Sequence, residues 1–204
     1  MKKYITICFT FFCFFTKAQV ITIAPGKIAP DIKLLNIDDK LVSFNDYPSA
    51  KGFIVVFTCN TCPYSKAYEQ RIIELNNKYA ALGFPVIAIN PNDPEASPGD
   101  NFAKMKQRAK SSKYNFPYLY DKGQAVTTLY GAKNTPHVFI VSKTAQGNII
   151  EYTGAIDNDT PNTNPGKTRY VEEALSALLN NKKPAITVTK AIGCRVSWKK
   201  DKQG

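Results

Sequence analysis

Short apolar runs alternate with segments of helical periodicity along this 204-residue chain. Three runs, residues 53–57, 84–89 and 137–141, are rich in β-branched and aromatic residues and lack a regular polar–apolar alternation. Strands buried on both faces have this pattern, because helices cover the sheet on either side. The three runs therefore predict inner strands of one sheet.

Four segments have the period of an α-helix. The first begins after Cys62 and places apolar residues at steps of three and four as far as Leu82, before Gly83 ends it. The others are expected at residues 99–110 and 125–130 and, before Pro184, around the apolar positions Val171, Ala174, Leu175, Leu178 and Leu179.

Two hairpins complete the pattern, one formed by residues 32–35 and 41–44 and one turning at residues 144–148. A short strand is also expected between the second and third helices. This order predicts an α/β fold with a mixed, mainly parallel central sheet flanked by helices. The irregular segment 155–167 is expected to be a solvated loop, since Asp157 and Asp159 are not followed by the further carboxylates of a calcium site.

The first residues have the three parts of a secretory signal. Lys2 and Lys3 precede an apolar run over residues 4–15, and Ala18 offers a small residue for cleavage. The run is shorter than the roughly 20 residues that span a bilayer. We expect a signal peptide at residues 1–18, export to the periplasm or envelope of a bacterium, and no stable membrane insertion afterwards; an N-terminal anchor or a buried strand is the alternative. Residues 19–204 are expected to form one domain that includes a C-terminal tail, 184–204.

The net charge is +11, and it falls to +8 when cleavage removes three lysines and no acid. The basic residues are scattered and form no block of Lys and Arg. We interpret this pattern as a basic solvated surface and expect no nucleic-acid partner.

Cleavage would leave three of the five cysteines: Cys59, Cys62 and Cys194. The first two lie where a buried strand gives way to a helix, at the carboxyl end of the strand, which is where open α/β sheets place their sites. Unpaired N–H groups and the helix dipole favour a thiolate there, and a second thiol one turn away can release a mixed disulfide. The spacing therefore predicts a redox pair.

Other interpretations of the pair are weaker. A zinc site needs two more ligands, and only Cys194 and His137 remain to supply them. A structural disulfide between Cys59 and Cys62 would close too short a loop to restrict the unfolded chain much. An inert, buried pair of thiols remains open.

Several motifs occur in the same order as in a known superfamily. They are APDIKLLNIDDKLVSFNDY, FTCNTCPYSKAYEQRI, VIAINPND, NFPYLYD, TPHVFIV and the ending IGCRVSWK. From about Ile28 to Trp198 the chain resembles the thioredoxin superfamily. The resemblance is to its redoxin branch, which holds alkyl-hydroperoxide-reductase-like proteins and exported thiol-disulfide oxidoreductases of the TlpA and ResA type. The motifs CPYSKAYE, NFPYLYD and IGCRVSWK are similar to a peroxiredoxin-like subgroup.

The resemblance implies a thioredoxin fold and a thiol-disulfide oxidoreductase. Cys59 would be the attacking thiolate and Cys62 the resolving thiol, while Thr135 and a cis Pro136 would position an extended substrate chain. Protein thiols or disulfides and a protein redox partner would exchange electrons with the pair, without a bound cofactor or metal.

The sequence departs from the family at two places. Val55 and Cys59 stand where peroxiredoxins have the proline and threonine of their peroxide pocket, and Phe53 stands where thioredoxins have a buried carboxylate. With Thr61 between the cysteines, no imidazolium stabilises a thiolate, which argues against a strong oxidant.

Two further residues have open roles. Cys194 is either a small buried apolar residue or a candidate resolving thiol, and we assign the lone His137 a structural role. Three alternative functions stay open: a thiol peroxidase in which Cys194 resolves, a metal or copper chaperone that binds through the two thiols, and a non-catalytic interaction module.

Overall fold

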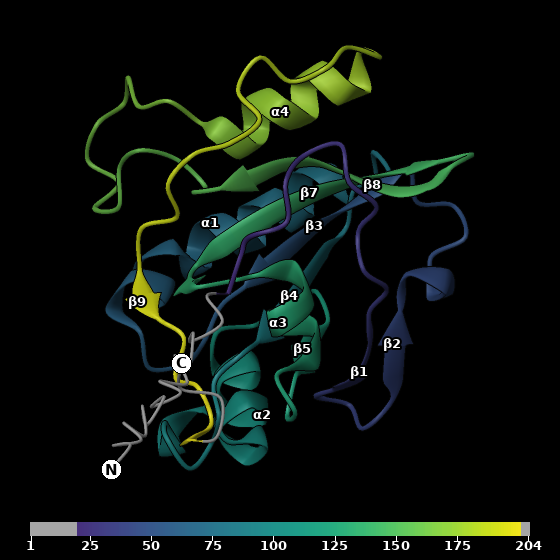
Figure 1. Cartoon of the computed structure of the whole chain (residues 1–204). Helices are drawn as coiled ribbons and strands as arrows, with labels where there is room; N and C mark the ends of the chain where they lie inside the picture. The colour runs from purple at the N-terminus through teal and green to yellow at the C-terminus, as the bar shows by residue number, and fades with distance from the viewer. Residues whose placement is uncertain (1–19, 201–204) are drawn as a thin grey trace, which may run out of the picture.

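The computed structural model describes residues 20–200, so the expected signal peptide lies outside the described residues. Within this range seven strands form one sheet in the order β2-β1-β5-β4-β3-β7-β8 (Figure 1). Their bounds are β1 Lys33–Asn36, β2 Leu41–Ser43, β3 Gly52–Phe57, β4 Val86–Asn90, β5 Tyr118–Tyr120, β7 His137–Thr144 and β8 Gly147–Gly154.

The sheet is mixed, as the sequence predicts. Its parallel pairs are β3 with β4 and β4 with β5, which lie at the centre. The pairs at both flanks are antiparallel, because β1 and β2 form one hairpin and β7 and β8 form the other. The parallel character is thus limited to the three strands that helical crossovers connect.

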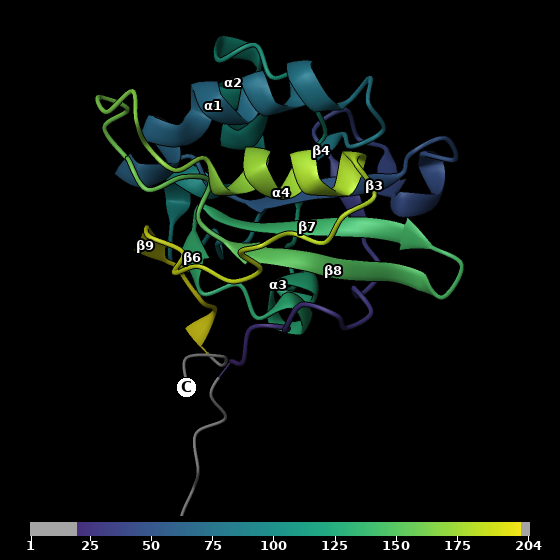
Figure 2. The ribbon, with the colours of Figure 1, turned by 90° about the horizontal axis from the view of Figure 1, so that it is seen from above.

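Helices cover both faces of the sheet. They are α1 Pro63–Tyr79, α2 Phe102–Ser111, α3 Ala125–Tyr130 and α4 Tyr170–Leu179, with short 3₁₀ segments at Phe44–Asp46 and Pro98–Asp100. Residues of α1, α2 and α4 share one apolar cluster with the sheet, and α3 packs with the N-terminal segment in a second cluster (Figure 2).

Strand β3 shows why its sequence lacks a polar face. Ile54 and Val56 point into the cluster of α1, α2 and α4, whereas Phe53, Val55 and Phe57 point into the cluster of α3. Successive side chains of a strand point to opposite faces, so a strand between two cores is apolar at every position. Such burial contributes about 1.5–3 kcal/mol for each large side chain.

The first helix is shorter than its pattern suggests. It ends at Tyr79, and Leu82 lies in the following turn with 44% of its surface exposed. At the other end Tyr64 is 40% exposed, although it continues the apolar periodicity. Only the central positions of the stripe face the core.

The middle of the segment after β8 is the solvated loop that the sequence predicts, since residues 161–166 are exposed, but both ends of the segment are buried. Asp157 is buried and accepts hydrogen bonds from Arg71 Nη1 at 2.8 and 2.7 Å and from Tyr68 at 2.9 Å. Lys167 Nζ lies 3.0 Å from the same carboxylate. The prediction fails only at these ends, because charged residues far apart in the sequence pair there, which offsets the cost of burying each one alone.

The C-terminal segment crosses the domain after α4. Val188 bridges to Thr153 at the end of β8, and β9 (Cys194–Arg195) then pairs with β6 (Asn134–Thr135) as a separate two-stranded sheet. In Figure 1 this yellow segment descends from α4 past the start of α1. The tail therefore passes the end of the sheet where β3 meets α1.

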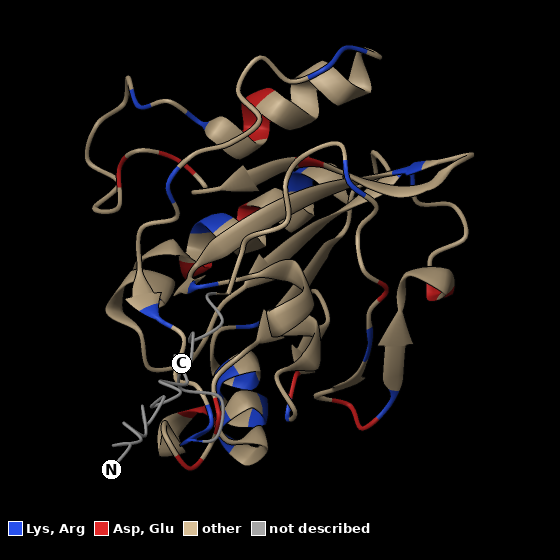
Figure 3. Cartoon of the chain, viewed as in Figure 1, with Lys and Arg blue, Asp and Glu red and all other residues tan. Residues whose placement is uncertain are grey.

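None of the helices in residues 20–200 is both long and apolar enough to cross a membrane. Lys and Arg are distributed over several elements, among them α2 (Figure 3). Two cations of α2 face acids: Lys106 lies 2.6 Å from Asp39, and Arg108 lies 2.7 Å from Glu69.

Candidate redox site

The two cysteines of the pair lie at the junction of β3 and α1. Cys59 follows the strand after one intervening residue, and Cys62 is the residue that caps the N-terminus of α1, with Pro63 as the first helical residue. Proline is favoured at this position because an N–H group there would have no acceptor within the helix, so proline loses no hydrogen bond. Both cysteines are free thiols and are only 4% and 3% exposed.

The peptide bond between Thr135 and Pro136 is cis and lies beside the pair, as the resemblance implies. Thr135 contacts both thiols: its hydroxyl lies 3.2 Å from Cys59 Sγ, and its carbonyl oxygen accepts a hydrogen bond of 3.1 Å from Cys62 Sγ. Ser65 Oγ is a weaker neighbour of Cys59, at 3.9 Å. Residues 76 positions apart in the sequence thus meet at the carboxyl end of β3.

The third cysteine lies at the same place. The backbone N–H of Cys194 donates to Cys62 Sγ at 3.4 Å. Strand β9 sets this position, because Cys194 is the register partner of Thr135. Cys194 itself is half-buried. The structure thus brings all three expected cysteines together.

The hydrogen bonds around the thiols separate their acidities. A bond from the Cys59 thiol lowers the pKa of Cys62 to about 4, with further donation from the Cys194 thiol and from the N–H groups of Ser65 and Cys194. The same bond raises the pKa of Cys59, as do burial and the charge of Asp100. Burial, and then donation to Cys62, raises the pKa of Cys194 to about 11. Cys62 is therefore the thiol whose ionisation the neighbouring donors favour, and ionisation removes the proton that it shares with the carbonyl oxygen of Thr135 in the neutral pair.

Asp100 is a site residue that the sequence analysis missed. Its buried carboxylate accepts from the N–H of Asn60 at 2.6 Å and from the hydroxyl of Thr61 at 2.7 Å, the two residues between the cysteines. Ser97 and Asn92 donate to the same carboxylate at 2.7 and 2.9 Å. Asp100 follows a proline and a glycine in a polar stretch, and nothing in that pattern distinguishes a buried acid from a solvated turn.

The residues that replace family positions lie in the apolar core. Phe53 and Val55 pack in the cluster of α3, so neither supplies a polar group to the thiols. His137 is buried and its Nε2 lies 2.9 Å from the hydroxyl of Thr153 on the neighbouring strand. Burial, and then the charge of Lys133, lowers the pKa of His137 to about 4, so its ring is neutral at pH 7.

Across residues 20–200, no cluster of three or more His, Cys, Asp and Glu side chains is arranged to hold a metal ion. The Cys-x-x-Cys pair at the N-terminus of a helix, the cis-proline beside it and the mixed sheet define a thioredoxin-fold protein of the redoxin class. Residues 25–152 match the AhpC/TSA family, and the chain therefore belongs to that family.

Two solved structures are similar over nearly the whole chain. One is an uncharacterized conserved protein from Geobacillus kaustophilus, with 34% identity and a TM-score of 0.79, covering 86% of this chain and 93% of that one. The other is a hypothetical protein from Sinorhizobium meliloti 1021, with 28% identity and a TM-score of 0.80, covering 88% of this chain and 97% of that one.

A putative thiol:disulfide interchange protein DsbE from Chlorobium tepidum shares the fold, with 21% identity and a TM-score of 0.53, covering 65% of this chain and 85% of that one. No curated protein gives a significant match to the chain. Together the family and the fold support an oxidoreductase.

Proposed function

We propose that the protein is an exported thiol-disulfide oxidoreductase that exchanges disulfides with protein partners through Cys59 and Cys62. The observation that carries this proposal is the mutual contact of the pair with Thr135, because one residue orients both thiols beside the cis-proline. Export is supported by the three-part N-terminal pattern, which lies outside the described residues.

The hydrogen bonds favour Cys62 as the attacking thiolate, the reverse of the order that the resemblance implies. Its thiolate would attack one sulfur of a partner disulfide, which forms a mixed disulfide and releases the other partner sulfur as a thiolate. Cys59 would then lose its proton to the leaving partner sulfur and attack Cys62 Sγ. The partner leaves as a dithiol, and a Cys59–Cys62 disulfide remains. A second protein dithiol would return the pair to its reduced form.

In this proposal the edge of β6 beside the pair positions the substrate. Thr135 and Pro136 would align an extended partner chain, but β9 occupies the edge of β6 in the structure. A partner chain that pairs with Thr135 would therefore take the place of the tail.

An assay of protein disulfide reduction tests this function. The chain from Gln19 onward would be mixed with a small dithiol and insulin, and the precipitation of reduced insulin chains would be followed. We expect Cys59→Ser and Cys62→Ser to abolish the acceleration, while circular dichroism shows that each variant is folded. Full activity in both folded variants would rule out the pair as the redox site.

A second candidate function is a thiol peroxidase. The family match favours it, and Cys62 stands at the position of the peroxidatic cysteine while its pKa is lowered. Cys62 would attack the peroxide, release an alcohol or water and become a sulfenic acid, and Cys194 or Cys59 would condense with it to give a disulfide and water. Hydroperoxide consumption that requires Cys62, in a protein that leaves insulin unreduced, would support this function instead.

A further inference from the structure

The tail is held across the redox site by a set of hydrogen bonds to the backbone and side chains of neighbouring segments. The N–H of Val196 donates to the carbonyl oxygen of Lys133 at 3.0 Å, and Asn134 Nδ2 donates to the carbonyl oxygen of Gly193 at 2.9 Å. Further along, the N–H of Ser197 donates to Asn92 Oδ1 at 2.9 Å. These contacts fix the segment on both sides of Cys194.

The approach of the tail to β6 depends on a glycine. A Cβ atom on Gly193 would lie 2.1 Å from the carbonyl oxygen of Thr135, far inside van der Waals contact. The residue before Cys194 can therefore come this close only without a side chain. The tail lies against the residue that precedes Pro136, at the edge where the resemblance places a substrate strand.

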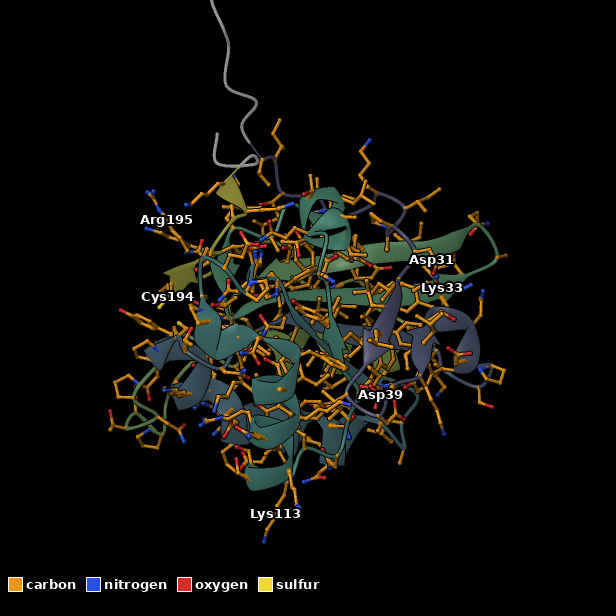
Figure 4. All side chains as sticks on the ribbon, turned by 90° about the horizontal axis from the view of Figure 1, so that it is seen from below. Asp31, Lys33, Asp39, Lys113, Cys194 and Arg195 are labelled. Carbon is orange, nitrogen blue, oxygen red and sulfur yellow. The ribbon has the colours of Figure 1, made fainter. Side chains whose placement is uncertain are left out.

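Cys194 differs from the other two thiols in its surroundings. Cys59 and Cys62 are buried, whereas Cys194 is half-buried, and Figure 4 shows it with the exposed Arg195 at the margin of the molecule. The backbone N–H of Cys194 donates to Cys62 Sγ, and Cys194 is the most exposed of the three thiols in residues 20–200.

We propose that Cys194 is a third redox-active thiol, which forms a disulfide with Cys62 and carries the oxidation state of the buried pair to the surface. This inference rests on the proposed function, because it begins from an oxidised Cys59–Cys62 pair. The tail would act as an internal substrate strand, and β9 is the element that presents its cysteine.

The exchange is balanced without an outside oxidant. The Cys194 thiolate attacks Cys62 Sγ, the bond between Cys59 and Cys62 breaks, and Cys59 leaves with the electron pair and takes up the proton that Cys194 released. One disulfide is lost and one is formed. A partner dithiol then attacks Cys194 Sγ, Cys62 leaves as a thiolate, and the second partner thiol releases Cys194.

The electrostatics of the site favour this direction. While Cys62 is a thiolate, its hydrogen bond with Cys194 is one cause that raises the pKa of Cys194. Once Cys62 is in a disulfide, that cause is removed and Cys194 ionises more readily. In the second step Cys62 is a good leaving group, because a thiol of low pKa leaves faster.

Disulfide mapping tests the proposal apart from turnover. Trypsin releases both cysteines of the pair in residues 52–66 and Cys194 in residues 191–195, so a disulfide to the tail joins two peptides of known mass. The purified chain from Gln19 onward would be equilibrated in buffers with a series of ratios of reduced to oxidised glutathione. It would then be alkylated and digested without reductant. We expect the joined peptides in the wild type and, more abundantly, in Cys59→Ser.

Cys62→Ser is the matched control, and it should give at least tenfold less of the joined peptides at the same poise. Folded Cys59→Ser that yields only free thiols or glutathione adducts would overturn the proposal, as would equal joining in Cys62→Ser. A wild type that forms only the Cys59–Cys62 disulfide would also overturn it. Because the peptides are read by mass, the result does not depend on whether insulin or peroxide is reduced.

Discussion

At the scale of single residues, the acidity of the pair is set by which sulfur accepts hydrogen bonds. Once Cys62 has lost the proton that it donates to Thr135, its sulfur accepts from the neighbouring thiols and from backbone N–H groups, whereas the charge of Asp100 is one cause that raises the pKa of Cys59. A thiolate is stabilised by donors and destabilised by a nearby anion. The two thiols of one Cys-x-x-Cys motif are therefore chemically distinct, and the sequence spacing does not show which one is the thiolate.

Alkylation at acidic pH shows whether Cys62 or Cys59 is the thiolate of the reduced pair. Only a thiolate reacts, so at pH 5.5 we expect iodoacetamide to modify Cys62 at least tenfold faster than Cys59 in the reduced protein. Peptide fragmentation locates the label, and Cys62→Ser shows how fast Cys59 reacts alone. Preferential labelling of Cys59 would restore the order of roles that the family resemblance implies.

Asp100 holds the residues between the cysteines, and its substitution should loosen them. In Asp100→Asn the negative charge is lost and the amide cannot accept from all the donors around it. We expect a loss of stability of about 2–4 kcal/mol, since bonds to charged groups contribute roughly 1.5–3 kcal/mol each and orphaned donors add to the cost. The pKa of Cys59 should fall, because one cause that raises it is removed.

Urea unfolding of Asp100→Asn measures the loss of stability. The pH dependence of Cys59 alkylation, followed in proteins that also carry Cys62→Ser, measures the change in the pKa of Cys59. Asp39→Asn serves as the control, because Asp39 is an exposed partner of Lys106 and lies outside the site. An Asp100→Asn protein as stable as this control would show that the carboxylate does not organise the site.

At the scale of elements, the regular secondary structure was predictable and the contacts between distant segments were not. The third helix occurs at the predicted residues 125–130, and β3 and β7 contain the predicted apolar runs. Periodicity carries this information locally. The pairing of β9 with β6 joins residues about 60 positions apart, and two-residue strands leave no repeating pattern to read.

Sequence patterns do not show contacts between distant segments, and this explains why the buried acids were not predicted. Asp100 and Asp157 are buried acids whose partners come from other elements, so their sequence neighbourhoods resemble solvated loops. The cysteines and the cis-proline were predictable because family motifs surround them. Where burial depends on a partner far along the chain, residue type alone favours exposure.

A glycine substitution tests whether β9 shields the pair. Gly193→Ala forces the tail away from Thr135, so we expect the reduced pair to react several-fold faster with a disulfide reagent such as DTNB. Gly123→Ala is the matched control, because a Cβ there would meet no atom within 4 Å. Equal rates in the two variants would mean that the tail does not limit access to the thiols.

At the scale of the whole molecule, the acidity of Cys62 links redox state to folding. The folded reduced protein keeps Cys62 ionised down to a pH of about 4, whereas an unfolded chain protonates it below about 8.5. Between these values the unfolded state binds more protons, so the stability of the reduced form rises with pH and is lost as pH falls toward 4. The oxidised form has no such proton to exchange.

We therefore expect the reduced protein to be more stable than the oxidised one at pH 8, with the gap closing toward pH 4.5. A difference of 1 kcal/mol shifts Tm by roughly 2–4 °C in a chain of this size, so melting curves followed by circular dichroism resolve it. His137 titrates in both forms, and its effect cancels in the difference. The short loop of the pair gives the oxidised form little compensating stability.

Cys62→Ser separates this linkage from other effects of the reductant. It lacks the ionising sulfur, so the rise in its reduced-form Tm from pH 4.5 to pH 8 should be smaller than that of the wild type. If instead the oxidised wild type melts higher at every pH, or the gap is constant, the Cys62 thiolate is not stabilised in the folded protein. A closing gap would show that ionisation of Cys62 stabilises the reduced form and so raises the reduction potential of the disulfide at neutral pH.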